Sequence, residues 1–268
     1  MLSKKRKKLR NNNGSQKRKK YLLWLSIALS GLLFILCGLL SQPRWMFSLA
    51  TRLFPGALYA VDLPTSQKNI ALTIDDGPSP STQEILALLE RYDVKATFFN
   101  ISSYLPGHEA TVQQSILQGH EIGNHLTADT ASIKLSPEIF EANLLSAEAA
   151  LLSLYPSPLE PSSQTPTIKL RWLRPGMGFY NHQMVRTAER HGYQVVLGSR
   201  FPYDTHIPSS RFASTFILST VQPGDIVVLH DGENGQGDRT LKTLKTILPA
   251  LQEKGYTITT LGQLEVGN

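Results

Sequence analysis

Several acidic, basic and histidine residues follow segments whose apolar pattern predicts strands. Carboxylate and imidazole side chains are ligands for divalent metal ions, so such residues gathered at strand ends can form a metal centre. Each position alone is weak support for a metal centre. An Asp pair after a strand often caps a helix, and a His at a strand end is often a surface residue whose hydrogen bonds are already made. Their recurrence at matching strand ends is the functional signal: Asp75 and Asp76, His125 with Asp129, Arg174, Asp204, and His230 with Asp231.

The segments that would position these residues alternate between strand and helix patterns. Residues 69–74 predict a strand that ends in the two aspartates, and residues 82–92 predict a helix with apolar residues at helical spacing. Further strands are expected at 96–101, 121–123, 169–173, 193–197, 225–229 and 256–260, with helices at 109–118, 180–191 and 239–253 and a long helix opened by Ser136, Pro137 and Glu138.

This alternation is typical of an α/β fold. About seven strand-helix units in roughly 200 residues predict a barrel that is smaller and less regular than an eight-unit one, with chemistry at the C-terminal ends of its strands. The stretch 155–167 is rich in Pro and Ser and is expected to be a surface loop.

The N-terminal region predicts one transmembrane helix. Residues 22–40 carry no charge and come close to the roughly 20 residues that cross a bilayer. Ten of the 27 Lys and Arg residues lie within residues 1–20, so the positive-inside rule keeps the N-terminus cytoplasmic and sends the rest across. A cleaved signal peptide is the alternative, but the apolar run exceeds the usual h-region of about 7–15 residues and no A-x-A-like site follows it. We therefore expect a retained single-pass anchor in the cell membrane.

These features divide the chain into a basic cytoplasmic tail at 1–20, a transmembrane signal anchor at 21–41, a juxtamembrane linker at 42–67 and a folded domain at 68–265. Beyond the tail there are 17 basic and 21 acidic residues, a net charge of −4. A basic tail on a mildly acidic body argues against nucleic-acid binding, which needs positive charge on the folded surface. We expect a monomer with no nucleic-acid partner.

Three motifs resemble those of the polysaccharide deacetylases that share the NodB-homology domain, a carbohydrate esterase type. LTIDDGP at 72–78 matches the first family motif, LHD at 229–231 the last, and GHEIGNH at 119–125 the approach to a metal-binding His. The resemblance covers about residues 68–262. It implies that the folded domain is catalytic, that it is a distorted (β/α) barrel, and that it hydrolyses an N- or O-acetyl group of a glycan.

The resemblance also implies roles for the motif residues. Asp75 would be the general base, and Asp76, His125 and Asp129 would bind a divalent metal ion. Adjacent residues at a strand end point to different sides, so one carboxylate can hold the cation while its neighbour faces the activated water. Asp129 stands where the family more often has a His, which keeps zinc as the expected metal but admits cobalt or manganese.

The third motif appears as RPGMG at 174–178, with Gly176 in place of a second Pro. Arg174 is the expected partner of Asp75, because a guanidinium beside the base fixes the orientation of its carboxylate. An ordinary surface salt bridge is the alternative for this Arg. The resemblance places an oxyanion-binding backbone N–H at Met177. Leu126 is a further departure, since the family usually has a Ser or Thr there whose hydroxyl braces the loop.

The fourth motif is the weakest, because FPYDTH at 201–206 stands where the family has Asp followed by Trp. Asp204 is the candidate from this stretch, with His206 as a rival functional residue. His230 would be the general acid that protonates the leaving amine, and Asp204 would raise its pKa so that it stays protonated. Leu229 would pack against the acetyl methyl group.

Together these residues predict a metal-dependent hydrolase that removes acetyl groups from the N-acetylated sugars of a polysaccharide, such as peptidoglycan in a cell wall. Two alternatives stay open. One is an esterase that removes O-acetyl groups, which the motifs do not separate from an amidase. The other is a catalytically silent glycan-binding member of the fold, which the altered fourth motif, Leu126 and Asp129 would allow.

Overall fold

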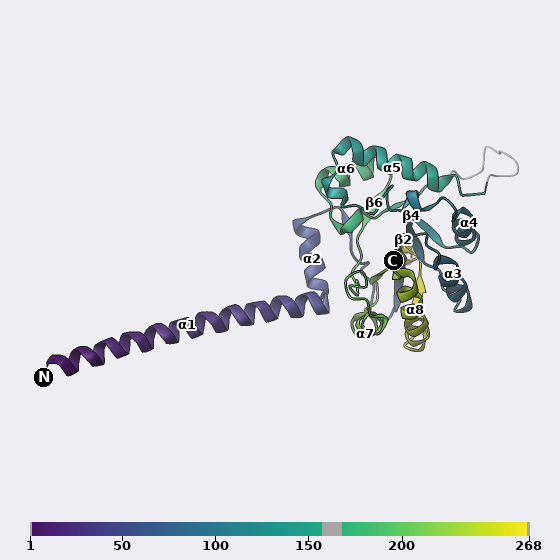
Figure 1. Cartoon of the computed structure of the whole chain (residues 1–268). Coiled ribbons are helices and arrows are strands. Elements are labelled where there is room, and N and C mark those ends of the chain that lie inside the picture. Colours follow the sequence, from purple (N-terminus) through teal and green to yellow (C-terminus); the bar gives the residue numbers. More distant parts are fainter. Residues whose placement is uncertain (1, 157–167, 267–268) are drawn as a thin grey trace. The chain divides into compact units, whose positions relative to one another are not determined.

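The computed structural model describes residues 2–156 and 168–266. It separates into two compact units, Met1–Met46 and Phe47–Asn268. The first unit is dominated by helix α1 (Leu2–Ser41), drawn in purple in Figure 1. Within α1, the segment Arg18–Leu36 is long and apolar enough to cross a membrane by length and composition.

The second unit is built on a parallel sheet, in the order β1-β6-β5-β4-β3-β2-β7. The eighth strand, β8, pairs with the first residues of β2, just before those that pair with β3. The strands are β1 (Ala57–Leu58), β2 (Asn69–Gly77), β3 (Thr97–Asn100), β4 (Glu121–Asn124), β5 (Trp172–Leu173), β6 (Gln194–Val196), β7 (Ile226–His230) and β8 (Thr257–Thr259).

Helices follow most strands and lie around the sheet (Figure 1). Ser136 and Pro137 open the long helix as the sequence predicts: the Ser136 hydroxyl accepts a hydrogen bond from the Ile139 N–H at 3.3 Å. The α-helices of this region are α2 (Arg44–Leu53), α3 (Thr82–Arg91), α4 (Glu109–Leu117), α5 (Pro137–Leu152), α6 (His182–Arg190), α7 (Ser210–Thr220), α8 (Gln236–Glu253) and α9 (Leu261–Val266), and the 3-10 helices are η1 (Ser102–Tyr104), η2 (Ser132–Lys134) and η3 (Gly176–Gly178).

Strand alternation creates two hydrophobic layers, one on each face of the curled sheet. Leu72 and Ile74 of β2 belong to the large cluster that packs against the helices. Ala71 belongs to a smaller cluster inside the curl, together with Phe99 and Trp172. Because successive side chains point to opposite faces, Asp75 lies on the inner face with Ala71. The inner face therefore delivers polar residues to the C-terminal mouth of the curl.

Residues after β6 draw the two ends of the sheet together. Arg200 bridges to Val227 in β7, and the Val228 N–H donates to the Arg200 carbonyl at 2.9 Å. The Arg200 side chain is buried and its Nε donates to Asp225 at 2.7 Å. The sheet is thus a curled, open parallel barrel surrounded by helices, and the predicted fold class is confirmed.

Four α-helices and strands differ from the expectation. The helices α7 and α9 were not anticipated, and both α2 and the strand at 57–58 lie where the sequence placed a linker at 42–67. Ala57 and Val61 are buried in the core, so this part of the presumed linker belongs to the folded unit. Most of the loop expected at 155–167 lies outside the described residues.

Gly198 offers a test of how tightly the curl is packed. Its φ is +94°, and an added Cβ would lie 2.5 Å from Cγ2 of Val228. Gly192 has a similar φ of +80°, but an added Cβ there would meet nothing within 4 Å. Gly198→Ala is expected to lower the free energy of unfolding by about 1–3 kcal/mol more than Gly192→Ala, because both strain the backbone and only the first overpacks the core. Urea denaturation of the two variants measures this difference, and equal losses would contradict it.

Candidate active site at the barrel mouth

The centre of the site is a buried ion pair between Asp75 at the end of β2 and Arg174 just after β5. The Arg174 Nη1 donates to Asp75 Oδ1 at 2.5 Å, and the two side chains are 3% exposed. The same nitrogen donates to Thr73 Oγ1 at 2.7 Å, and Nε donates to the Val196 carbonyl at 3.1 Å. The guanidinium also lies over the Phe99 ring, 4.1 Å from its centroid. The predicted Asp75–Arg174 contact is therefore present and buried, which excludes an ordinary surface salt bridge.

Asp76 and His125 form a second pair beside the first. Asp76 has a φ of 62°, which turns its side chain away from the regular strand. His125 Nε2 lies 3.1 Å from Asp76 Oδ1, and His125 Nδ1 lies 2.6 Å from the Arg174 carbonyl oxygen. Burial would raise the pKa of Asp76, but the hydrogen bond and charge of His125 lower it below its usual value.

The loop that carries His125 is braced without a hydroxyl at position 126. Leu126 is buried and has a φ of 65°. Its N–H donates to Asn124 Oδ1 at 2.8 Å, while Asn124 Nδ2 donates to the Leu144 carbonyl at 3.0 Å. The Asn124 amide thus ties the loop to α5, so the missing Ser or Thr leaves the loop supported.

The Asp76–His125 pair fits a divalent cation. A carbonyl oxygen only accepts hydrogen bonds, so His125 Nδ1 carries a hydrogen and donates a hydrogen bond to the backbone carbonyl of Arg174. A hydrogen bond of this kind usually supports a metal-binding His. Burial would lower the pKa of His125, but its hydrogen bond to Asp76 and the charges of Asp75 and Asp76 raise it, so without a cation the ring donates from Nε2 to Asp76. A neutral ring would turn a lone pair on Nε2 toward the same carboxylate, and a cation between the two would then bind both. Asp129 lines the same cavity, and burial together with the charge of Asp76 raises its pKa.

The predicted three-ligand set is not assembled in full. Among the described residues, no group of three His, Cys, Asp or Glu side chains is close enough to hold a metal ion. Asp76 and His125 are in contact, whereas Asp129 is near them without joining them. The role of Asp129 as third ligand therefore stays a prediction.

His230 and Asp204 form the second acid–base pair of the mouth. His230 is the direct register partner of Asp75 on the neighbouring strand β7. Asp204 accepts from the His230 ring at Nδ1 and from the His230 backbone N–H, both at 3.0 Å. Burial alone would lower the pKa of His230, but the charge and hydrogen bond of Asp204, with the charges of Asp75 and Asp76, raise it to about 9. The weak fourth motif thus supplies the expected partner of His230. His206 Nδ1 lies 2.8 Å from the Thr205 hydroxyl, and the His206 ring meets the Phe201 ring edge to face.

Asp231 faces away from the reaction space. It is buried, and it accepts hydrogen bonds from the hydroxyls of Ser79 and Thr82 at the start of α3. Burial raises its pKa to about 6. Its N–H also donates to the Asp75 carbonyl at 2.7 Å, so Asp231 ties β2, β7 and α3 together.

A cavity of about 440 Å³ opens between these pairs and is lined by Asp75, Asp76, Asp129, Arg174 and His230 among others. Met177 lies at its rim, 60% exposed, with a φ of 61°. The apolar wall of the cavity includes Leu197, Phe201 and Val228. The Phe201 ring meets the His230 ring edge to face, with centroids 5.5 Å apart.

The prediction for Leu229 is wrong. Its side chain is 0% exposed and belongs to the core that packs against the helices, so it cannot touch an acetyl group. Residues two apart on a strand share a face, so Val228 and His230 face the cavity side, whereas Leu229 points outward. The alternation of β7 was available in the sequence and would have identified Val228. Phe201 had no such signal, because it follows β6 in an irregular segment, whereas Leu197 ends the strand expected at 193–197 and lies just after β6.

The altered third motif has a steric reason. An added Cβ at Gly176 would lie 2.1 Å from the Thr130 carbonyl oxygen. The Gly176 N–H donates to Ser132 Oγ at 2.7 Å, a bond that a Pro cannot make. Gly176 therefore matches the way η2 packs against η3 in this chain, and the substitution for Pro is compensated locally.

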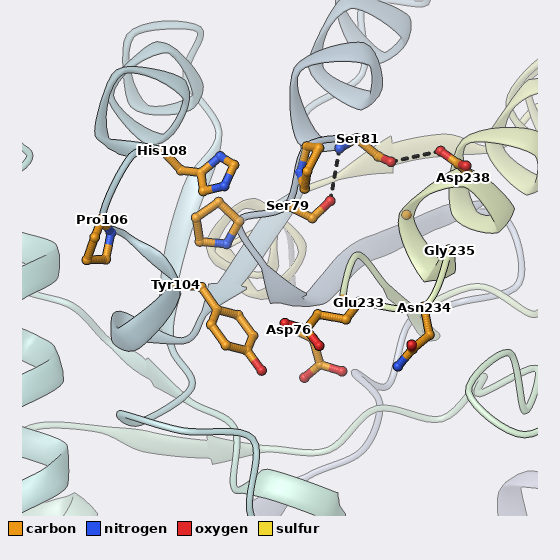
Figure 2. Close-up of a pocket in the computed structure, with 14 residues that line it drawn as sticks. Asp76, Ser79, Ser81, Tyr104, Pro106, His108, Glu233, Asn234, Gly235 and Asp238 are labelled. Carbon is orange, nitrogen blue, oxygen red and sulfur yellow. Dashed lines mark hydrogen bonds between the residues drawn. The ribbon is translucent and has the colours of Figure 1, made fainter.

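A second cavity of about 610 Å³ adjoins the first and shares Asp76 with it (Figure 2). Tyr104 stands on one side of this groove, and Glu233 and Asn234 stand on the other, near Asp76. Ser81 donates to Asp238 at 2.9 Å across its far end. No motif marks Tyr104, Glu233 or Asn234, which lie in the segments that follow β3 and β7.

Comparison with known proteins places this arrangement among related sequences. Residues 62–196 match the profile of the family described as polysaccharide deacetylase. A peptidoglycan-N-acetylglucosamine deacetylase of Bacillus cereus is 33% identical over 219 residues, which cover 81% of this chain and 97% of that protein. A chitooligosaccharide deacetylase of Bradyrhizobium sp. is 29% identical over 208 residues, covering 74% of this chain and 90% of that protein.

Solved structures share the fold at lower identity. A CE4 family pseudoenzyme from Bacillus anthracis matches with a TM-score of 0.67 and 21% identity, covering 78% of this chain and 69% of that chain. A peptidoglycan N-acetylglucosamine deacetylase, solved in complex with a substituted N-oxidanyl-benzamide, matches with a TM-score of 0.68 and 24% identity, covering 80% and 94%. The same barrel therefore occurs in a protein described as an enzyme and in one described as a pseudoenzyme.

The Asp76–His125 pair can be tested by metal content. His125→Ala is expected to lower the amount of Zn²⁺ retained per chain, because it removes the only imidazole that contacts Asp76 in the described part of the chain. His206→Ala is the matched control, since His206 lines the same cavity without contacting Asp76. Elemental analysis after Zn²⁺ loading and dialysis measures both. Equal retention by the two variants would show that His125 is not a ligand.

Proposed function

The chain belongs to the polysaccharide deacetylase family, and from that premise we propose that it hydrolyses the acetamide of an N-acetylated sugar in a cell-envelope glycan. Deacetylation of this kind releases acetate and leaves a free amine on the sugar. The observation that carries the proposal is the pairing of Asp75 with His230 on adjacent strands, one held by Arg174 and the other by Asp204, both facing one cavity.

Asp75 takes the role of general base. Its Oδ1 is held by Arg174, so the carboxylate keeps a fixed direction at the floor of the cavity. It removes a proton from water as the water oxygen bonds to the carbonyl carbon, which gives a tetrahedral adduct. A divalent ion held by Asp76 and His125, with Asp129 as the third ligand, would acidify that water and polarise the carbonyl.

His230 takes the role of general acid. Its Nδ1 is bonded to Asp204, which leaves Nε2 to deliver a proton into the cavity. The raised pKa keeps the ring protonated at neutral pH. As the carbon–nitrogen bond of the tetrahedral adduct breaks, the proton on Nε2 passes to the amide nitrogen. The sugar is released with a free amine, and the acetyl group is released as acetate.

The remaining cavity residues orient the acetyl group. Val228, Leu197 and Phe201 form an apolar wall that suits a methyl group and disfavours water. Met177, at the rim, is the residue whose backbone N–H we assign to the developing oxyanion. Its left-handed φ of 61° turns the peptide away from the regular course of η3.

We also propose that the enzyme is anchored in the cell membrane by α1, with a cytoplasmic basic tail and an extracytoplasmic catalytic domain. The apolar segment Arg18–Leu36 and the basic residues that precede it support this topology. Peptidoglycan is the favoured glycan, because the relative from Bacillus cereus is a peptidoglycan-N-acetylglucosamine deacetylase and such a polymer lies within reach of an anchored enzyme.

Two alternatives to N-deacetylation are distinguished by experiment. An O-acetyl esterase would use the same residues on an ester, whose leaving alkoxide accepts the proton from His230. A silent glycan-binding protein is the second alternative, which the incomplete grouping of metal ligands in the described part of the chain would allow. Both are outcomes of the assay that follows.

The proposal predicts acetate release from chito-oligosaccharides and peptidoglycan by the Zn²⁺-loaded full-length chain in detergent. Asp75→Asn keeps the size of the side chain but cannot accept the proton, so turnover is expected to fall on the order of 10²–10⁴-fold. Asp93→Asn, the same change in the turn after α3, is the matched control and should leave turnover near the original.

Each outcome of this assay is informative. Release from acetylated xylan without release from chito-oligosaccharides would make the enzyme an esterase. Binding of these glycans without acetate release from any of them would make it a silent member. An unchanged rate in Asp75→Asn would remove Asp75 from the mechanism.

The pH profile tests the His230–Asp204 pair. The acid must be protonated, so the rate should fall as the pH rises through the pKa of His230, about 9. Asp204→Asn removes a charge that raises this pKa, and the alkaline limb should therefore move to lower pH. Rate profiles of both proteins between about pH 5 and pH 10 measure the shift. If the limb stays in place while His230→Ala is inactive, Asp204 is not the partner.

A further inference from the structure

Helix α2 carries an exposed apolar face directly after the candidate membrane span. Trp45, Leu49 and Leu53 recur every four residues, so they line one side of the helix. They are 55%, 47% and 61% exposed, and Phe54 beyond the helix end is 59% exposed. Large apolar residues gathered in this way on a soluble surface mark a contact with another apolar body. We call Trp45, Leu49, Leu53 and Phe54 the α2 stripe.

The rest of α2 is already tied to the catalytic unit. The Phe47 ring packs against Tyr59, with centroids 5.6 Å apart. The Tyr180 hydroxyl donates to the Phe54 carbonyl at 2.5 Å and lies 3.3 Å from the Tyr59 hydroxyl. Strand β1 then joins the sheet through β6. From Phe47 onward, α2 therefore moves with the barrel and is no free linker.

The position of α2 in the chain indicates which apolar surface the stripe contacts. Residues 21–43 are uncharged, and about 20 residues of helix cross a bilayer. Only Gln42 and Pro43 separate α1 from α2, so α2 begins where the hydrocarbon layer ends. Trp45 also stacks on Phe34 within the span, with centroids 6.4 Å apart, which places this ring at the depth of the apolar layer.

The composition of α2 fits a lipid surface rather than a second protein copy. It has no acidic residue. At about 3.6 residues per turn, Arg44 lies across the helix from the stripe, and Arg52 lies beside Trp45 at the edge of the stripe. Arginines beside an apolar stripe can reach anionic lipid phosphates while the stripe enters the acyl boundary. Trp is also enriched at the membrane–water interface. We propose that α2 lies in this interface with its stripe in the bilayer, which rests on the proposed anchoring by α1.

The consequence is that the barrel is held to the membrane at two points. The membrane span tethers the chain to the bilayer. The α2 stripe restricts the orientation of the catalytic unit, because α2 from Phe47 onward belongs to that unit. The catalytic unit then has fewer orientations over the bilayer than a single flexible tether would allow.

Lipid contact is measured on the full-length chain in vesicles of phosphatidylethanolamine and phosphatidylglycerol with brominated acyl chains. In a Cys37→Ser background, single cysteines at Leu49→Cys and Leu53→Cys carry a polarity-sensitive fluorophore. Thr51→Cys, on the opposite side of the same helix, is the matched control, and Leu32→Cys reports insertion of α1. We expect bromolipid to quench positions 49 and 53 several-fold more than position 51, and aqueous iodide to show the reverse order.

The outcomes separate this inference from those on which it rests. Iodide quenching at 49 and 53 equal to that at 51, with position 32 quenched by bromolipid, would overturn the proposal while leaving the anchor intact. Energy transfer between labels at position 49 of two chains, without bromolipid quenching, would assign the stripe to a second copy and also overturn it. Leu49→Glu combined with Leu53→Glu should abolish bromolipid quenching of a label at Phe54→Cys, whereas Thr51→Glu should not. Hydrolysis of soluble chito-oligosaccharide should be the same in both variants, since α2 lies outside the catalytic cavity.

Discussion

The buried pair of Arg174 and Asp75 is the contact on which the site depends. Removing one partner of such a pair costs about 3–5 kcal/mol, because the other charge is left buried. Here the cation is further held by Thr73, by the Val196 carbonyl and by the Phe99 ring, so it has little freedom to turn. The same residue accepts from His125 through its backbone carbonyl. One arginine therefore orients both the base and the imidazole of the metal pair.

This arrangement follows from the curl of the sheet. Parallel strands bring their C-terminal ends to one mouth, and alternation along β2 and β7 puts Asp75 and His230 on the inner face, directly beside each other. The bridge between Arg200 and Val227 brings the segment after β6 against β7, which carries Phe201 and Asp204 to His230. Strand register therefore sets the acid beside the base, and the segment after β6 brings Asp204 to the acid.

Much of the fold and of the site could be predicted, since buried strands and amphipathic helices carry strong periodic signals. The pairs Asp75–Arg174 and His230–Asp204 were predicted from motifs and are in contact. The errors have physical causes. Leu229 was assigned without the two-residue period of its strand, and β1 is too short at two residues to show any period. Tyr104 ends the short helix η1 and Glu233 lies in a turn, and tertiary folding brings the two together at the groove beside Asp76 without any local sequence signal.

Fold alone does not decide whether such a barrel is catalytic, because a pseudoenzyme and a deacetylase share it at similar TM-scores. The departures in this chain are more informative. At Gly176 the missing Pro is explained by the Thr130 carbonyl and replaced by a bond to Ser132, and at Leu126 the missing hydroxyl is replaced by the amide of Asn124. These contacts keep the loops in place around an intact base, acid and Asp76–His125 pair. The departures from the family motifs therefore leave the arrangement needed for catalysis in place, which agrees with an active enzyme.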